Sequence, residues 1–524
     1  MATSFPACDS TGVGLAADVQ TLAGLLRLSG SNEPPRDHEV SLLRAQVARA
    51  SERLASLDAE ISLLHDHLRR LEQDRADLSR YRAQQKAILS PLRRVPPEIL
   101  VHIFRDVVGA VPEPLRIDSG PWPLSHACSR WRAVALRDRR LWSKIQLNFS
   151  LKRWYSVEMI EEQVDRADLL DVIFVGNEGG NDDLQVFVFN VLAAHSARWR
   201  ELTIQLTSFL APAVEHLDFR SLQKAHVHWH HPHSQLPEAD SVDLLRTAVS
   251  LADMSVSCRW RAVPVHPPIV NQLTRYRLDA PWRTHAELLR RLPNLEFAVV
   301  LHAFDRDDAG SEATDTIDLP RLRQLFVDSD VCLDHLRAPA LEAISVRHVD
   351  GAYDGAYDAL VRFLGRSSCS PRRLCLQGRF DAQAAAEVLQ RCPTLTEIGV
   401  VFGPEDGASV ARCLQLFTVG GSTPPPMTFP HVKVIAISCV DVDAMFHPAF
   451  LDMIDSRRGA PSGAFEAAEL GVLHPGPEPD PRSAARLERL ARDGFSLSVL
   501  LRDRANAHKH RWLIAWCVPP RHEH

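Results

Sequence analysis

A long segment without helix-breaking residues is the feature that most constrains this fold. From Arg36 to Ser90 there is neither glycine nor proline, and apolar residues recur in two rows with a seven-residue period. Rows offset by three residues form the a and d positions of a coiled-coil heptad. We therefore expect one long helix over residues 36–88. Its apolar seam is predicted to contain Val47, Leu54, Leu57, Ile61, Leu64, Leu68 and Leu71.

Two arrangements of this helix are compatible with the pattern. It can lie against its own chain as a single helix, or it can pair with a second copy as a two-stranded coiled coil, which makes a homodimer through the coil one expected partner state. Arg75 takes the seam position that follows Leu68, so the seam weakens toward its C-terminal end.

Two adjacent prolines interrupt the stretch LSPLRRVPPEILVHIFRDVV, residues 89–108. Proline cannot donate a backbone hydrogen bond and drives the preceding residue away from helical geometry, so the long helix must end before Val95. Proline suits the first turn of a new helix, and Glu98 lies where the helix dipole favours a carboxylate. A second, shorter helix is therefore predicted to begin at these prolines.

This shorter helix is predicted to carry a wide apolar stripe, with Arg105 on its outer face. The stripe residues recur at spacings of three and four, which is typical of an amphipathic helix. They are Ile99, Leu100, Ile103, Phe104 and Val107. A further amphipathic helix follows in PLSHACSRWRAVALRD. Its inner face is predicted to contain Leu124, Cys128, Trp131 and Ala135, before Leu141 and Trp142 close the unit.

Short strand-like runs alternate with helix-like segments over residues 150–458. Many runs are entered through a leucine, at intervals of roughly 20 to 30 residues, which resembles the spacing of leucine-rich repeats. The aligned entry leucines are Leu273, Leu295, Leu322, Leu341, Leu374 and Leu395. Such units bury their apolar faces by stacking, so an irregular repeat solenoid is predicted, and an ordinary mixed α/β domain is the alternative.

The two ends of the chain have a different composition. Glycine and proline are frequent in residues 1–35, which predicts a disordered leader. Residues 459–524 combine proline-rich loops with a helix expected around Ala484 to Arg492 and a final strand-like WLIAWCV. This region is predicted to cap the repeats or to form a tail.

Charge and cysteine usage narrow the possible partners and location. The net charge is −6 with a pI near 6.5, which gives no electrostatic reason to expect nucleic acid or an anionic membrane as a partner. The ten cysteines contain no CxxC pair, and no segment is apolar over the ~20 residues that a membrane span requires. We expect a cytoplasmic or nuclear protein whose partners are other proteins.

No catalytic motif is present in the sequence. It lacks a GxSxG elbow, a GxxxxGK[ST] phosphate loop and an HExxH zinc helix, so neither an enzyme nor a cofactor is expected. The run HVHWHHPH contains alternating histidines that could share a metal ion. They are His226, His228, His230, His231 and His233. Because the surrounding sequence offers no supporting ligands, a solvated strand edge is the preferred interpretation and no metal site is predicted.

The segments VPPEILVHIF, CSRWRAVA and LW, in this order, resemble the F-box. With a heptad helix before them and leucine-type repeats after them, the chain is similar to F-box proteins that are abundant in mushroom-forming fungi. The resemblance covers residues 89–147 and implies docking on the Skp-type adaptor of a cullin ubiquitin ligase. It assigns the adaptor contact to Leu92, Val95, Pro96, Pro97, Ile99, Leu100, Ile103 and Phe104. It assigns the core of the F-box to Cys128, Trp131 and Trp142.

Two functions are consistent with this reading. The resemblance implies a substrate-recruiting subunit of the ubiquitin-conjugation pathway, which performs no bond chemistry and presents its repeats to an unknown target protein. The alternative is a coiled-coil, leucine-repeat scaffold that is not attached to a ligase, with residues 89–147 serving as a helical hairpin between coil and repeats. The expected fold class for both is α/β: a long N-terminal helix, a small helical unit and an irregular repeat solenoid.

Overall fold

A computed structural model of the chain divides it into two units, Met1–Pro96 and Pro97–His524. The structure describes residues 28, 30, 32, 34–109, 115, 117–151, 154–229, 245–258, 271–301, 315–347, 355–378, 380–403, 407–420, 429, 431–440, 446–460, 465–474, 479–502 and 504–505.

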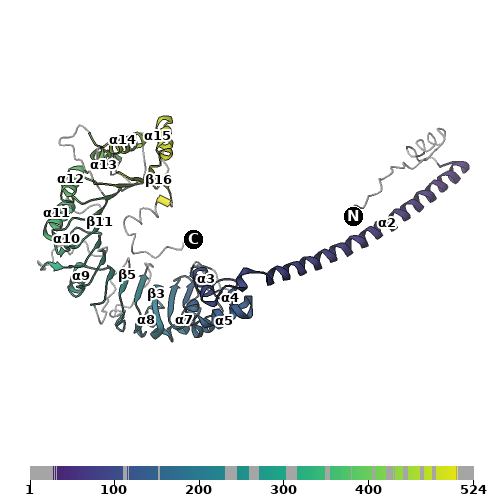
Figure 1. Ribbon diagram of the computed structural model, residues 1–524, viewed down its shortest axis with the longest axis horizontal. Coiled ribbons are helices and arrows are strands. Elements are labelled where there is room, and N and C mark those ends of the chain that lie inside the picture. The colour runs from purple at the N-terminus through teal and green to yellow at the C-terminus, as the bar shows by residue number, and fades with distance from the viewer. Residues whose placement is uncertain are drawn as a thin grey trace. The chain divides into compact units, whose positions relative to one another are not determined.

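The first unit contains the long helix α2, Asp37–Ile88, followed by the 3-10 turn η1, Pro91–Arg93 (Figure 1). At ~1.5 Å per residue the 52 residues of α2 extend about 78 Å. The helix starts with two acidic residues in its first turn, and Glu39 accepts a hydrogen bond from the Arg36 backbone at 2.8 Å. It ends because Pro91 disfavours helical geometry at Ser90. The prediction of a long N-terminal helix is confirmed.

The second unit begins with a small group of helices, which we call the helical segment. It comprises α3 (Pro97–Gly109), α4 (Trp122–Ala127), α5 (Ser129–Arg137) and the 3-10 turn η2 (Arg139–Trp142). Pro97 is the first residue of α3, as its fixed geometry favours. The single helix predicted over PLSHACSRWRAVALRD is wrong, because Cys128 adopts an extended backbone (φ −162°, ψ 167°) and separates α4 from α5.

A 14-stranded parallel sheet forms the rest of the second unit. Except for the steps from β7 to β9 and from β9 to β11, hydrogen-bonded neighbours are consecutive in the chain, and β8 and β10 pair separately. The strands are β1 Lys144–Asn148, β2 Leu170–Val175, β3 Trp199–Gln205, β4 Lys224–Trp229, β5 Asp253–Cys258, β6 Arg275–Asp279, β7 Phe297–Leu301, β8 Ile317–Asp318, β9 Gln324–Val327, β10 Leu336–Arg337, β11 Ala343–Arg347, β12 Arg373–Gln377, β13 Glu397–Val401, β14 Val434–Cys439, β15 Ala467–Val472 and β16 Ser496–Leu501.

Helices connect many of the strands and lie on one side of the sheet (Figure 1). Parallel neighbours require such crossover connections, because the chain must return to the same end of the sheet. The connecting elements are α6 Val157–Arg166, α7 Asp182–Ala193, η3 Ser196–Arg198, α8 Ala211–Glu215, α9 Trp282–Leu289, α10 Val331–Asp334, α11 Ala356–Ser367, α12 Ala382–Gln390, α13 Gly407–Phe417, α14 Phe446–Arg458 and α15 Pro481–Arg492.

Alternation along each strand decides which residues form the core. One apolar residue per strand enters a buried row that crosses the sheet in register, for example Val172, Leu202 and Ala225 on adjacent strands. The aligned leucines also lie in the core, with exposures of 3% or less. Five of the six precede their strand by two residues, whereas Leu374 lies inside β12 and pairs with Ile344. The alignment of Leu374 with the other entry leucines is therefore wrong.

The sheet extends beyond both ends of the predicted repeat region. β1 begins at Lys144, inside the range assigned to the F-box, and β15 and β16 follow residue 458. The helix expected near Ala484 is present as α15. The strand-like WLIAWCV and the leader up to residue 27 lie outside the described residues.

Candidate partner-binding surfaces

Helix α3 has one buried and one exposed apolar face. Leu100 and Phe104 are 0% and 1% exposed, and Val108 continues their row at 5%. The other row consists of Ile99, Ile103 and Val107, which are 49%, 40% and 49% exposed. We call these last three residues the α3 stripe. They recur every four residues on a single helix, so they present a continuous apolar surface to solvent.

The buried face of α3 packs on aromatic side chains of the helical segment. The Trp131 ring meets the Phe104 ring edge-on with centroids 5.0 Å apart, and Trp131 itself is half-buried. Trp142 is fully buried, and its indole N–H donates to the Ala135 carbonyl at 2.9 Å. These contacts explain why α3 folds with Leu100 and Phe104 inward.

Contacts through Trp122 join the helical segment to the sheet. Its ring lies edge-on to Trp142 at 5.2 Å, and its indole N–H donates to Gln163 Oε1 at 3.2 Å. Gln163 in turn donates through Nε2 to the Lys144 carbonyl at the start of β1, at 2.7 Å. The Arg166 guanidinium lies 4.4 Å from the Trp142 ring centroid and 5.0 Å from that of Trp122. The helices that hold α3 are thus packed against the first strand of the sheet and α6.

Arg105 holds α3 to the end of α5. Its Nε and Nη2 donate to the two carboxylate oxygens of Asp138 at 2.8 and 3.0 Å, a bidentate pair. The hydrogen bond with Asp138 raises the pKa of Arg105 above its usual value. The sequence predicts Arg105 on the outer face of this helix; its side chain is 38% exposed there and is held by Asp138.

The residues assigned to the adaptor contact differ in accessibility. Leu100 and Phe104 are buried within the second unit, so a partner could reach them only after local unfolding. Ile99, Ile103 and Pro97 are exposed. In the first unit, Leu92 and Pro96 are exposed and Val95 is half-buried.

Cys128 differs from the expectation of a core residue. It is exposed, and its sulfur accepts a hydrogen bond from the Trp131 backbone N–H at 3.4 Å, so it caps α5. An extended residue directly before a helix is the usual position of such a cap. Trp131 and Trp142, by contrast, do pack in the helical segment.

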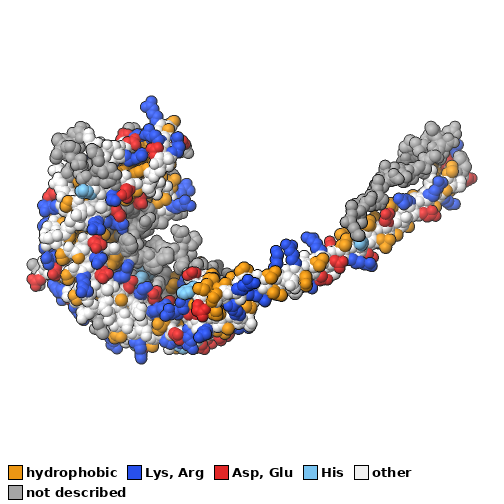
Figure 2. Space-filling model, viewed as in Figure 1, with side chains coloured by type: hydrophobic (Ala, Val, Ile, Leu, Met, Phe, Trp, Pro, Cys, Tyr) orange, Lys and Arg blue, Asp and Glu red, His pale blue; other side chains and the backbone are white. Residues whose placement is uncertain are grey.

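The seam of α2 is exposed along its length. Leu57 is 37% exposed and Val47 is 64% exposed, and the other predicted seam residues lie between these values. Figure 2 shows apolar side chains interspersed with charged ones along this helix.

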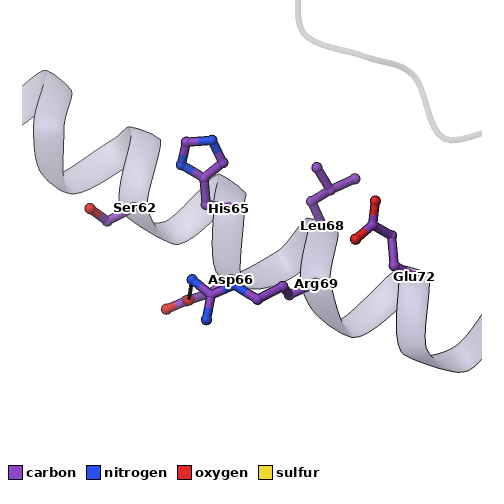
Figure 3. A pocket seen from close by; sticks show the side chains of 6 residues that line it. All are labelled: Ser62, His65, Asp66, Leu68, Arg69 and Glu72. Carbon is purple, nitrogen blue, oxygen red and sulfur yellow. Dashed lines mark ion pairs between the residues drawn. The ribbon is translucent and has the colours of Figure 1, made fainter.

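A depression of about 400 Å³ lies on α2 beside Leu68. Its lining consists of Ser62, His65, Asp66, Leu68, Arg69 and Glu72. Figure 3 shows His65, Leu68 and Glu72 projecting from the same side of the helix, with Arg69 paired to Asp66 at 3.0 Å on another side. One helix supplies the whole lining, so these six side chains form an open surface rather than an enclosed ligand site.

The face of the sheet that carries no helices contains a polar half, on β3 to β6, and a largely apolar half, on β7 to β13, which also carries the Arg373–Glu397 ion pair. In the polar half, ion pairs join neighbouring strands, including Lys224 with Glu201 at 2.6 Å and Arg275 with Asp253 at 3.3 Å. The apolar half is a cluster of buried side chains. Its members are Phe297, Val299, Phe326, Cys375 and Val401. The spacing of the leucines does not predict this division, because those leucines mark the strand starts and not the outward-facing residue of each strand.

The histidine run is only partly described. His226 and His228 lie on β4, and His228 Nδ1 is 2.7 Å from Ser257 Oγ on β5. His230, His231 and His233 lie outside the described residues. Among the residues that the structure does describe, no group of three histidine, cysteine or acidic side chains is placed to hold a metal ion.

Comparisons with known proteins do not name a family. No protein-family model matches this chain, and a search of curated proteins finds no match. Within the described part of the chain, no helix combines the length and the apolar character needed to cross a bilayer.

Proposed function

We propose that this chain is a substrate-recruiting F-box subunit of a Skp–cullin–F-box ubiquitin ligase. The observation that carries the proposal is the division of α3 into a buried row and the exposed α3 stripe directly after a proline-led turn. Solitary exposed apolar residues are ordinary, but a row of three β-branched side chains on one helix face is suited to a protein partner.

The support beneath α3 fits a docking role. The Phe104–Trp131 contact and the Arg105–Asp138 pair hold the helix from its inner side, so the α3 stripe is ordered before any partner binds. A preordered surface loses less conformational entropy on association than a mobile one. In this proposal Ile99, Ile103 and Val107 contact the adaptor, while Leu100 and Phe104 act indirectly by holding α3 in place.

The parallel sheet is proposed to be an irregular leucine-rich-repeat solenoid that binds the target. The support is the consecutive order of the strands, the leucines buried before them, and the helices on one side. In stacked strand-and-helix units of this kind, the face formed by the strands is the surface that binds a partner. The polar, ion-paired half of that face is the proposed target surface, because its half-exposed charged side chains can give specificity.

The exposed seam of α2 is a separate observation that supports the scaffold function. Such a seam can pair with another helix whether or not the chain is part of a ligase. Coexpression of the full chain with a Skp-type adaptor distinguishes the two functions. The F-box proposal predicts that the two proteins elute together on gel filtration. It also predicts that the adaptor stays bound to the captured chain through repeated washes. Absence of a complex at micromolar concentrations of both proteins would contradict it and favour the scaffold.

A further inference from the structure

We propose that α2 pairs with α2 of a second copy of this chain as a parallel, in-register, two-stranded coiled coil. The surface is the exposed seam, and its occupant is the same segment of another molecule. This inference rests on α2 alone and does not depend on the F-box proposal.

The first argument is the choice of apolar residue in each row of the seam. The a row contains Val40, Val47 and Ile61 together with Leu54 and Leu68, and Arg75 takes the next a position, where the seam weakens. The d row from Leu43 to Leu78 is leucine throughout, except at Ala50. In parallel coiled coils, β-branched residues at a with leucine at d favour two strands, because each residue type fits the side-chain geometry of its own layer.

The second argument is the charge on both flanks of the seam. In a parallel pair, each g residue faces the e residue five positions later on the other helix. The resulting pairs are Arg53 with Asp58, which carry opposite charges, and Glu60 with His65 and His67 with Glu72, in which an imidazole N–H can donate a hydrogen bond to the carboxylate. None of them places like charges together. His65 and Glu72 border Leu68 on the same side of α2 in Figure 3, as the flank of a seam layer requires.

The antiparallel arrangement brings fewer of the flanking e and g residues next to a complementary residue of the second copy. The alignment that keeps both apolar rows in contact matches Ile61 with Leu57 of the second copy. It sets His67 opposite Gln46 and Glu72 opposite Ser51, so the His67–Glu72 pair is lost. It also mixes the a and d layers, which removes the separation of β-branched residues and leucines.

Two ion pairs within α2 do not involve the e and g residues that flank the seam. Arg69 pairs with Asp66 at 3.0 Å and Arg80 with Asp77 at 3.3 Å, and all four residues lie at positions outside a, d, e and g. The helix can therefore keep these pairs when a second copy covers the seam. The side chains of Leu54, Ile61 and Leu64, now 61%, 49% and 62% exposed, would lose their contact with water.

Cysteine substitution in the full chain tests the orientation. Leu43→Cys places a thiol in a d layer near the start of α2, where only a parallel, in-register pair brings the two copies together. Ala45→Cys is the matched control, because position f faces away from the seam. Under mild oxidation, Leu43→Cys should yield a disulfide-linked dimer on a non-reducing gel and Ala45→Cys should match wild type. Equal cross-linking of the two variants, or none from Leu43→Cys, would overturn the parallel arrangement.

A charge exchange gives an independent readout by sedimentation of the full chain. Arg53→Glu sets a carboxylate against Asp58 of the second copy and should raise the dimer dissociation constant about tenfold. The double variant Arg53→Glu, Asp58→Arg restores opposite charges in the parallel pair and should return the constant to within about threefold of wild type. In an antiparallel pair the double variant would not recover affinity, because the carboxylate introduced at position 53 would face Glu60 and the arginine introduced at position 58 would face His65. That outcome, or a monomeric wild-type chain, would refute the proposal.

Discussion

Replacing Leu100 and its neighbour Ile99 by alanine tests the packing of α3 in one matched pair. Leu100 is 0% exposed and Ile99 is 49% exposed, although the two residues are adjacent. Truncation of a buried leucine to alanine costs ~2 to 5 kcal/mol, from lost transfer free energy and the cavity that remains. Truncation of the exposed Ile99 should change stability by less than ~0.5 kcal/mol, helped by the higher helix propensity of alanine.

Hydrogen exchange of backbone amides in residues 97–109 is the suitable assay, because it reports local opening of α3 without requiring the whole chain to unfold in one step. A cost of ~2 kcal/mol corresponds to about 30-fold faster exchange through opening for Leu100→Ala. Ile99→Ala should accelerate exchange by less than about threefold. Similar effects from both substitutions, or protection of α3 in Leu100→Ala, would show that the helix does not pack through this face.

Three further predictions concern other parts of the chain. Arg105→Ala should speed exchange in α3 by about two- to fivefold, because it removes a half-exposed bidentate pair worth ~0.5 to 1 kcal/mol; unchanged exchange would show that the pair contributes nothing. Leu57→Lys with Leu64→Lys should convert a dimer to a monomer by light scattering, since two seam layers would bury charge, and a persistent dimer would exclude the α2 seam. Burial raises the pKa of the Cys375 and Cys392 thiols to about 12, so at pH 8 only about one in 10,000 is a thiolate. Iodoacetamide at pH 8 should therefore label the exposed Cys128 and spare these two, and rapid labelling of Cys375 would show that the apolar cluster is open.

The elements with a long or regular pattern could be predicted from the sequence. The heptad rows predicted α2, because a seven-residue period over many turns has few alternative explanations. The mixed α/β class and many of the strands followed from short apolar runs between helix-like segments. Leu374 was misaligned because a leucine two residues before a strand and one within it look alike in a single sequence.

Side-chain orientation in the helical segment could not be predicted in the same way. A stripe containing both Ile99 and Leu100 is too wide for periodicity to say which residue faces the core. That choice depends on Trp131, which packs on Phe104 from helix α5. Arg105 has the charge of a surface residue, and only tertiary structure brings Asp138 within hydrogen-bonding distance of it. Cys128 has the burial preference of an apolar residue, but the break between α4 and α5 makes it a cap.

Capture of a Skp-type adaptor by the full chain and by the double variant Ile99→Asp, Ile103→Asp tests the central claim most directly. Both residues are exposed, so the variant should fold, while each carboxylate would be desolvated without a counter-ion at the interface. Phe187→Asp on α7 is the matched control, since Phe187 is 55% exposed but lies outside α3. The account predicts that wild type and Phe187→Asp bind the adaptor equally, and that the double variant binds at least ~100-fold more weakly, equivalent to ~2.7 kcal/mol. A soluble double variant that binds the adaptor as tightly as wild type would contradict the F-box assignment.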